Sequence, residues 1–149
     1  LSNSFGFGGH NAVLVLRPAD RGKRGKVVFA ESFAWFASAG WAPREGQPLP
    51  LATQGESCRI RAEAVRALDR AGIEWREVFV GKGAAILGAA AVAGLAVAVL
   101  ARRAAPPGTV DVSGLLSLPA IRSQDVMLYS NLSDRLTRDA LRVLTLAFQ

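Results

Sequence analysis

The sequence predicts an α/β domain with a largely parallel sheet, and three observations lead to this class. Strand-like apolar runs alternate with amphipathic, helix-like segments along most of the chain, which is the order typical of α/β folds. Half of the 149 residues are apolar and a fifth are charged, as in globular proteins and unlike disordered ones. A chain of this length buries roughly two thirds of its unfolded surface, so it needs no disulfide framework.

The first 26 residues differ from the rest in composition and charge. Residues 1–9 are rich in Gly, Ser and Phe and predict a loop, and residues 11–17 predict a strand. Residues 1–26 carry five basic residues and one acidic residue, a net charge of +4, whereas the remaining 123 residues carry +2. A basic run can contact nucleic acid or an anionic surface. Because no aromatic or base-reading side chains alternate with it, we expect a solvated linker, and the nearly neutral body predicts no DNA-binding surface.

Helix-like and strand-like segments alternate after this linker. Residues 56–71 place apolar side chains on one helical face, and Gly72 is positioned to end that helix. Residues 84–95 predict an Ala-rich second helix, and residues 134–147 predict a third, with Ser133 as its N-cap. The strand-like runs are residues 27–29, 33–38, 49–53, 74–80, 96–100 and 125–130.

Residues 83–101 form an uninterrupted uncharged run that is long enough to cross a membrane. Ala and Gly make up most of the run, and they contribute little to insertion. No Trp or Tyr anchors either end, and both flanks are basic. We therefore expect a buried helix followed by a buried strand, divided at Gly94 and Leu95, rather than a membrane span.

The residue types needed for most catalytic and metal sites are scarce. Cys58 and His10 are the single cysteine and the single histidine of the chain, which excludes a disulfide and a Cys-based zinc site. Neither has an evident partner for nucleophilic catalysis. The sequence thus predicts no catalytic residue, no metal site, no cofactor and no enzyme.

Two turns that follow predicted strands are the candidate binding residues. Residues 81–83 (Gly-Lys-Gly) lie between a strand and a helix, but they lack the spacing of a nucleotide-binding P-loop. Such a turn exposes backbone N–H groups that can hold an anion, although a purely geometric role is an equal alternative. The turn 53–58 has the same setting and gathers hydroxyl, amide and thiol groups, as in the ligand clefts of open α/β sheets; its alternative role is helix capping.

Residues 1–17 resemble the C-terminus of β-ketoacyl-ACP synthases. The segment Ser-Phe-Gly-Phe-Gly-Gly-His-Asn, from Ser4 to Asn11, carries the resemblance. In that family it forms a glycine-rich loop beside the active site, with Phe7 matching a gating phenylalanine. The family's nucleophilic cysteine and catalytic histidines have no counterpart here, so the resemblance implies a short tail and not a condensing enzyme.

Residues 29–149 resemble the effector-binding domain of LysR-type transcriptional regulators. The resemblance rests on several segments in the right order, with Ala96 in place of a usual Gly and Ala101 in place of a usual Pro. These segments are FAWFAS, QPLPLAT, the Gly-Glu-Ser-Cys helix start, RAEAVRALDRAGIEWREVFV, ILGAAAVAGLAVAVLAR, PPGTVDV, LPAI and DVMLYS.

This second resemblance implies a type 2 periplasmic-binding-protein-like fold, in which a small effector binds between two lobes. We expect three segments: a ketosynthase-like tail (1–17), a basic linker (18–28) and a partial effector-binding domain (29–149). One lobe would be incomplete and the DNA-binding helix-turn-helix absent, so we expect weak or lost effector binding and an exposed apolar face on the final helix. The residues that match the family's cleft are Thr53, Gln54, Gly55, Glu56, Ser57, Gly81 and Lys82.

The functional expectation is therefore a ligand-sensing domain for a small anionic or aromatic effector. We expect it in the cytoplasm, without membrane or direct DNA contact, as a homo-oligomer or in association with a full-length regulator. Two alternatives stay open: a fragment of a β-ketoacyl-ACP synthase, and a single-pass membrane protein spanning 83–101.

Overall fold

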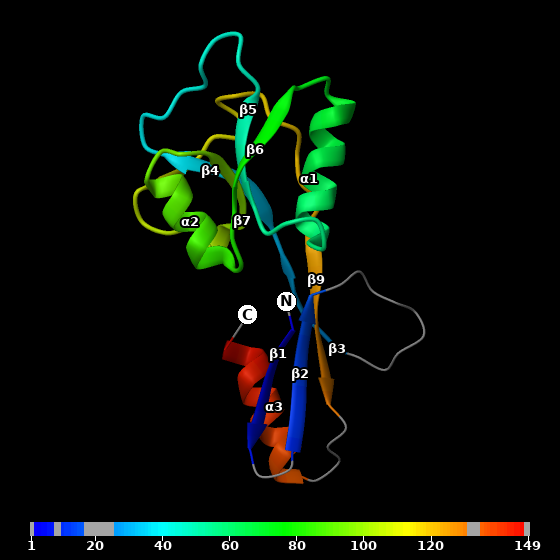
Figure 1. The fold of residues 1–149 in the computed structure, drawn as a ribbon. Helices are drawn as coiled ribbons and strands as arrows, with labels where there is room; N and C mark the ends of the chain where they lie inside the picture. Colours follow the sequence, from blue (N-terminus) through cyan, green and yellow to red (C-terminus); the bar gives the residue numbers. More distant parts are fainter. Residues whose placement is uncertain (1, 8–9, 17–25, 131–134, 148–149) are drawn as a thin grey trace. The chain divides into compact units, whose positions relative to one another are not determined.

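The computed structural model describes residues 2–7, 10–16, 26–130 and 135–147 (Figure 1). The chain divides into two compact units, one formed by residues 1–31 and 123–149 and the other by residues 32–122. Each unit has its own sheet, and we describe them in turn.

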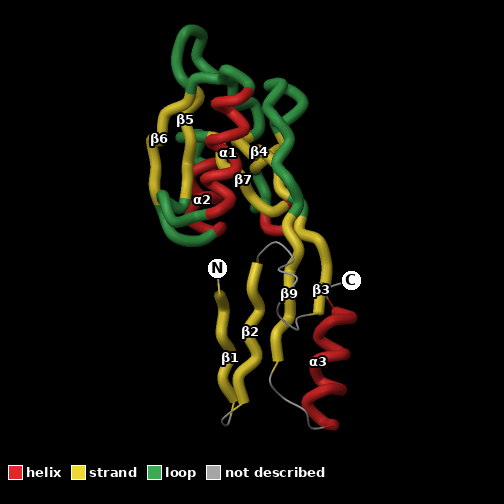
Figure 2. Tube along the Cα trace, turned by 90° about the vertical axis from the view of Figure 1, so that its right-hand side faces the viewer, coloured by secondary structure: helices red, strands yellow, loops and turns green. Residues whose placement is uncertain are grey.

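The first unit contains a four-stranded antiparallel sheet (Figure 2). The strand order is β1-β2-β9-β3, so the late strand β9 lies between two strands from the start of the chain. A helix, α3, follows β9. The bounds are β1 (Ser2–Phe7), β2 (His10–Leu16), β3 (Lys26–Glu31), β9 (Gln124–Ser130) and α3 (Arg135–Ala147).

The expectation of a loop at the start of the chain is wrong for residues 2–7, because β1 pairs with β2 from Ser2 opposite Val15 to Phe7 opposite His10. Such pairing overrides the weak strand propensity of Gly and Ser. β3 starts at Lys26, so residues 26–28 of the expected linker are strand. The rest of that linker and Ser133 lie outside the described residues.

The second unit is an α/β layer structure with a five-stranded mixed sheet. Its order is β6-β5-β7-β4-β8, in which β5 pairs in parallel with β6 and β7, while β4 pairs antiparallel with β7 and β8. The α/β class is thus confirmed, and parallel pairing is confined to β6, β5 and β7. The bounds are β4 (Phe33–Ser38), β5 (Leu49–Thr53), α1 (Arg59–Arg70), β6 (Trp75–Val80), α2 (Ala84–Val92), β7 (Val97–Ala101), a 3₁₀ turn (Arg102–Ala104) and β8 (Thr109–Asp111).

The helices α1 and α2 cover opposite faces of this sheet (Figure 1). The chain passes from β5 to β6 on one side and then crosses β5 to reach β7 on the other side, and crossovers of one hand place the two helices on opposite faces. One hydrophobic cluster joins α1 to Trp35, Leu51 and Val97, and the other joins α2 to Phe36, Ala52 and Ala98.

The long apolar run divides as predicted, into α2 and β7, and its lack of charge agrees with the burial of β7 and of one side of α2. Ala91, Ala96, Val97 and Ala98 are all fully buried. Small side chains allow close approach, and Gly88 of α2 lies against Pro106. Among the described helices, none is long and apolar enough to cross a membrane.

Both helices of this unit end at glycines in the left-handed region. After α1, Gly72 has φ +67°, and the Ile73 N–H donates to Leu68 O. After α2, Gly94 has φ +73°, and the Leu95 N–H donates to Ala90 O. These are the bonds of a Schellman motif, so the predicted end of the first helix at Gly72 is confirmed.

Candidate functional site

The two predicted turns meet at the carboxyl edge of the parallel strands. β5 is the strand at which the chain reverses its direction across the sheet, and its neighbours β6 and β7 lie on either side. In open α/β sheets, ligands bind outside the carboxyl ends of strands at such a reversal. Here β5 leads into the turn before α1, and β6 leads into the turn before α2.

Hydrogen bonds hold the two turns together. The Gly81 N–H donates to Thr53 O at 3.0 Å, and the Gly83 N–H donates to the Gln54 side-chain oxygen at 3.3 Å. Because that oxygen faces Gly83, the amide NH₂ group of Gln54 is left to donate elsewhere. Glu56, Ser57 and Lys82 are exposed on the same two turns. Their side chains make no hydrogen bond to Thr53, Gln54, Gly81 or Gly83.

The first turns of α1 and α2 present backbone N–H groups at this edge. The N-cap residues, Cys58 and Gly83, make no side-chain capping bond, and neither first turn contains an acidic residue. The first N–H groups bonded within the helices are those of Ala62 and Leu87. The three amides before each of them therefore lack an intrahelical partner and favour a negative charge.

Exposed apolar side chains border the same turns. Val80 and Ile86 are 58% and 48% exposed. A Cβ placed on Gly55 would lie 3.6 Å from Val80 Cγ1, and one placed on Gly81 would lie 2.5 Å from Ile86 Cγ2. The backbone of both turns thus runs directly beside apolar surface.

Sequence reasoning missed two charged residues beneath the first turn, Arg61 and Glu77. The Arg61 Nε donates to Glu77 Oε2 at 2.7 Å, and the Thr53 hydroxyl donates to the same oxygen. The Arg61 side chain also lies over the Trp75 ring, 5.9 Å from its centroid. One sequence signal could have indicated this pair. Glu77 is an acidic residue at an inward position of a predicted strand, and Arg61 lies in the first turn of the helix before it.

This arrangement shifts the pKa values of both charged groups. The hydrogen bond from Arg61, followed by that from Thr53, lowers the pKa of the Glu77 carboxyl despite partial burial. The hydrogen bond to Glu77 is the main cause that raises the pKa of Arg61. Both groups are therefore charged at neutral pH, and each stabilises the other.

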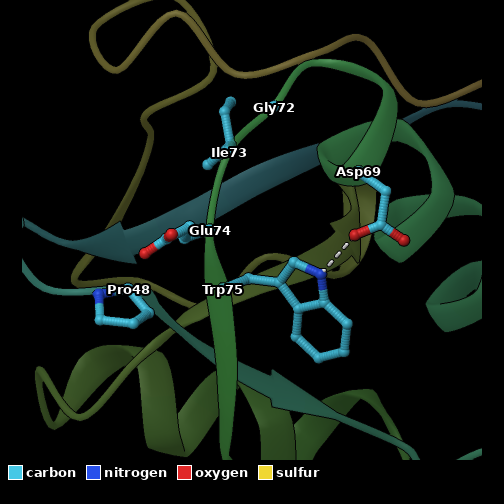
Figure 3. A pocket seen from close by; sticks show the side chains of 6 residues that line it. All are labelled: Pro48, Asp69, Gly72, Ile73, Glu74 and Trp75. Carbon is cyan, nitrogen blue, oxygen red and sulfur yellow. Dashed lines mark hydrogen bonds between the residues drawn. The ribbon is translucent and has the colours of Figure 1, made fainter.

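A shallow hollow of about 470 Å³ lies at the opposite end of β5 and β6 (Figure 3). The Trp75 Nε1 donates to Asp69 Oδ1 at 2.9 Å along its wall. None of the predicted site residues is part of it. The lining residues are Pro48, Asp69, Gly72, Ile73, Glu74 and Trp75.

Within the described ranges, no group of three His, Cys, Asp or Glu side chains is arranged to hold a metal ion. Cys58 is a free, partly exposed thiol at the start of α1.

A family model of the LysR substrate binding domain matches residues 10–147. The match thus begins within the segment predicted to resemble a ketosynthase and ahead of residue 29. No curated protein matches the chain in sequence.

Several solved regulatory domains of similar fold are known. One is the CcmR regulatory domain of Synechocystis PCC6803 in complex with 2-PG, with a TM-score of 0.64 and 12% identity; the match covers 90% of this chain and 71% of that one. The HypT regulatory domain of Salmonella typhimurium gives 0.66 and 18%, over 90% and 73%. The CrgA regulatory domain of Neisseria meningitidis, a LysR-type regulator, gives 0.63 and 15%, over 91% and 75%. At these identities the similarity concerns the fold, and the chain spans 50% of the full-length HypT structure.

Proposed function

Because this chain belongs to the LysR substrate-binding domain family, an effector-binding regulatory domain of transcriptional regulators, we propose that it binds a small anionic effector with an apolar body. The proposed contacts are the adjoining turns 53–57 and 81–82. The observation that carries the proposal is the meeting of two uncapped helix starts at the carboxyl edge of β5 and β6.

Each part of the proposed effector has a counterpart at this edge. The free amides in the first turns of α1 and α2, the Gln54 amide and the Lys82 ammonium would bind the anionic group. Val80 and Ile86 would contact the apolar body. Glu56 and Ser57 complete the rim, where they would bear on selectivity. Because the edge is exposed, we expect weak binding, with a Kd of about 1 mM.

The wider expectations from the sequence remain part of this proposal. The domain would act by binding and not by catalysis, without a cofactor, in the cytoplasm. It would contact no membrane and no DNA, and it would work as a homo-oligomer or with a full-length regulator. The family's ligand-binding regulatory role supports the first of these expectations, binding rather than catalysis.

A separate proposal concerns the origin of residues 1–17. The Ser4–Asn11 motif supports descent of this segment from a β-ketoacyl-ACP synthase, ahead of an effector domain beginning near residue 29. An in-frame thiolase-type core encoded upstream would support this origin, and a helix-turn-helix there would contradict it.

Benzoate is a suitable probe, because it combines a carboxylate with an aromatic ring. Saturation-transfer NMR on the full chain detects weak binding and yields a Kd. We expect benzoate to bind more tightly than benzyl alcohol, which lacks the charge, and than acetate, which lacks the ring. Equal binding of all three would contradict the proposed effector class.

A matched pair of charge reversals locates the site. Lys82→Glu should weaken benzoate binding by about tenfold, since it places a negative charge beside the free amides. Arg44→Glu changes the net charge equally in an exposed loop before β5, and it should leave the Kd within twofold. The same loss in both variants would show that only net charge matters.

A further inference from the structure

A chain of hydrogen bonds runs from α1 through β6 and β5 into the turn after β5. Arg61 donates to Glu77, and Glu77 accepts from the Thr53 hydroxyl through the same oxygen. Thr53 Oγ1 in turn accepts from the Gly55 N–H at 3.2 Å. Thr53 is 7% exposed, and the Arg61 and Glu77 side chains are 17% and 24% exposed.

The direction of these bonds is fixed by chemistry. A guanidinium only donates, and an ionised carboxylate only accepts. The Thr53 hydroxyl must therefore donate its hydrogen bond to Glu77. This orientation turns the lone pairs of Thr53 Oγ1 toward the Gly55 N–H. Gly55 is held with φ +86°, a conformation that suits glycine, so the relay and the glycine together define the turn.

A bulge in β6 directly follows Glu77. Leu51 pairs with Glu77, but the next residue of β5, Ala52, pairs with Phe79, so Val78 has no partner on β5. Side chains alternate along a strand, and the extra residue sends Phe79 to the α2 face, where it packs against the Ala52 cluster. Bulges of this kind redirect side chains next to functional sites.

We propose that Glu77, oriented by Arg61, is a positioning residue that fixes the Thr53 hydroxyl and thereby the shape of the effector-binding turn. Its role in binding rests on the proposed function, whereas its effect on the turn does not. A turn held in its binding shape avoids the cost of ordering on binding. Loss of the relay at Glu77 should therefore loosen Gly55 and weaken binding without removing an effector contact.

The first test needs no effector. Amide hydrogen exchange is measured on the full chain at Gly55 and at Val112, whose N–H donates to Trp35 O on β4, two strands away from β5 in the sheet. Glu77→Gln keeps the shape but removes the negative charge that strengthens both bonds to this oxygen, and Thr53→Val keeps the shape but loses the hydroxyl. Each should speed exchange at Gly55 by about tenfold and leave Val112 within twofold.

Two variants serve as controls. Thr53→Ser restores the hydroxyl and should return Gly55 exchange to within twofold of the wild type. Asp111→Asn breaks the ion pair with Arg102 elsewhere in the same unit and should leave Gly55 unchanged. Unchanged Gly55 exchange in Glu77→Gln, or equal acceleration at Gly55 and Val112, would overturn the proposal. If Glu77→Gln does not fold, the Thr53→Val and Thr53→Ser pair decides the same point.

The second test is benzoate affinity in the same variants. We expect a Kd about tenfold higher in Glu77→Gln, which changes no residue of the two turns, and a Kd within twofold of the wild type in Thr53→Ser. A looser turn with unchanged affinity would overturn the positioning role. Failure of the wild type to bind benzoate would contradict the proposed function instead, while the exchange measurements would still decide whether Glu77 shapes the turn.

Discussion

Gly81 occupies a position where the fold leaves no room for a side chain. A Cβ there would lie 2.5 Å from Ile86 Cγ2 and 2.9 Å from the Phe79 ring, both closer than van der Waals contact. The residue was predicted for its place in a turn, but contact with two apolar side chains is what requires glycine. Chain order alone cannot reveal such a contact, because Ile86 approaches only once α2 has formed.

Gly81→Ala should accordingly destabilise the protein by about 1–3 kcal/mol, the usual cost of overpacking. Gly114→Ala is the matched control, because a Cβ there would meet no atom within 4 Å, and it should change stability by less than about 0.5 kcal/mol. Denaturant unfolding measures both. Equal stability of the two variants would show that the turn rearranges freely.

The lowered pKa of the Glu77 carboxyl implies that the free energy of unfolding falls at low pH. The Arg61 hydrogen bond, then the Thr53 hydroxyl, hold the pKa of Glu77 below its ordinary value of 4.5, and Glu56 and Cys58 also act on Arg61. A carboxylate with a lowered pKa stabilises the fold above the ordinary value, and this contribution is lost as pH falls through the folded pKa.

The wild type should therefore lose more stability than Glu77→Gln when the pH is lowered from about 5 to about 3. Denaturant unfolding across this pH range gives the comparison directly. Parallel stability profiles for the two proteins would show that the carboxylate contributes nothing through its charge.

At the scale of elements, α1 and α2 are anchored by different means. α1 is amphipathic and inserts Ala64, Ala67 and Leu68 into the core, so its apolar spacing predicted it well. α2 is apolar on every side and is held by close approach of Ala and Gly to the sheet and to Pro106. Both helices begin at the turns that form the proposed site, so their packing also positions the free amides.

Leu68 is fully buried, and Leu68→Ala should cost about 2–5 kcal/mol of unfolding free energy, through lost burial and the cavity left behind. Leu115→Ala makes the same change at a side chain that is 77% exposed, and it should cost less than about 0.5 kcal/mol. A small, equal effect of both substitutions on denaturant unfolding would contradict the packing of α1 described above.

The buried strands of the second unit could be predicted from the sequence, whereas the edge strands β1 and β8 could not. Residues 33–38 and 49–53 were predicted with the observed bounds of β4 and β5, because buried strands are continuous apolar runs. β1 and the three-residue β8 depend on pairing with β2 and β4, which no local pattern indicates. The first helix begins at Arg59 and not at residue 56, because the Cys58 N–H donates to Gly55 O in a turn.

At the scale of the molecule, two units arise because the chain leaves the first sheet after Glu31 and returns to it at Gln124. The site is only partly predictable from the sequence, because part of it depends on contacts between separate elements. Its turns follow strands and carry recognisable residues. The Arg61–Glu77–Thr53 relay, in contrast, joins α1, β6 and β5 beside a bulge. On the apolar face of the last helix, which was expected to be exposed, Leu144 is 43% exposed and Leu141 is partly buried.

The central claim is that this regulatory domain binds an anionic effector at the two adjoining turns. Amide chemical-shift mapping of the full chain during a benzoate titration tests it most directly. The account predicts saturable shifts concentrated at residues 53–57 and 81–86. Shifts centred instead on the hollow beside Trp75, or no saturable shift at any amide, would contradict it.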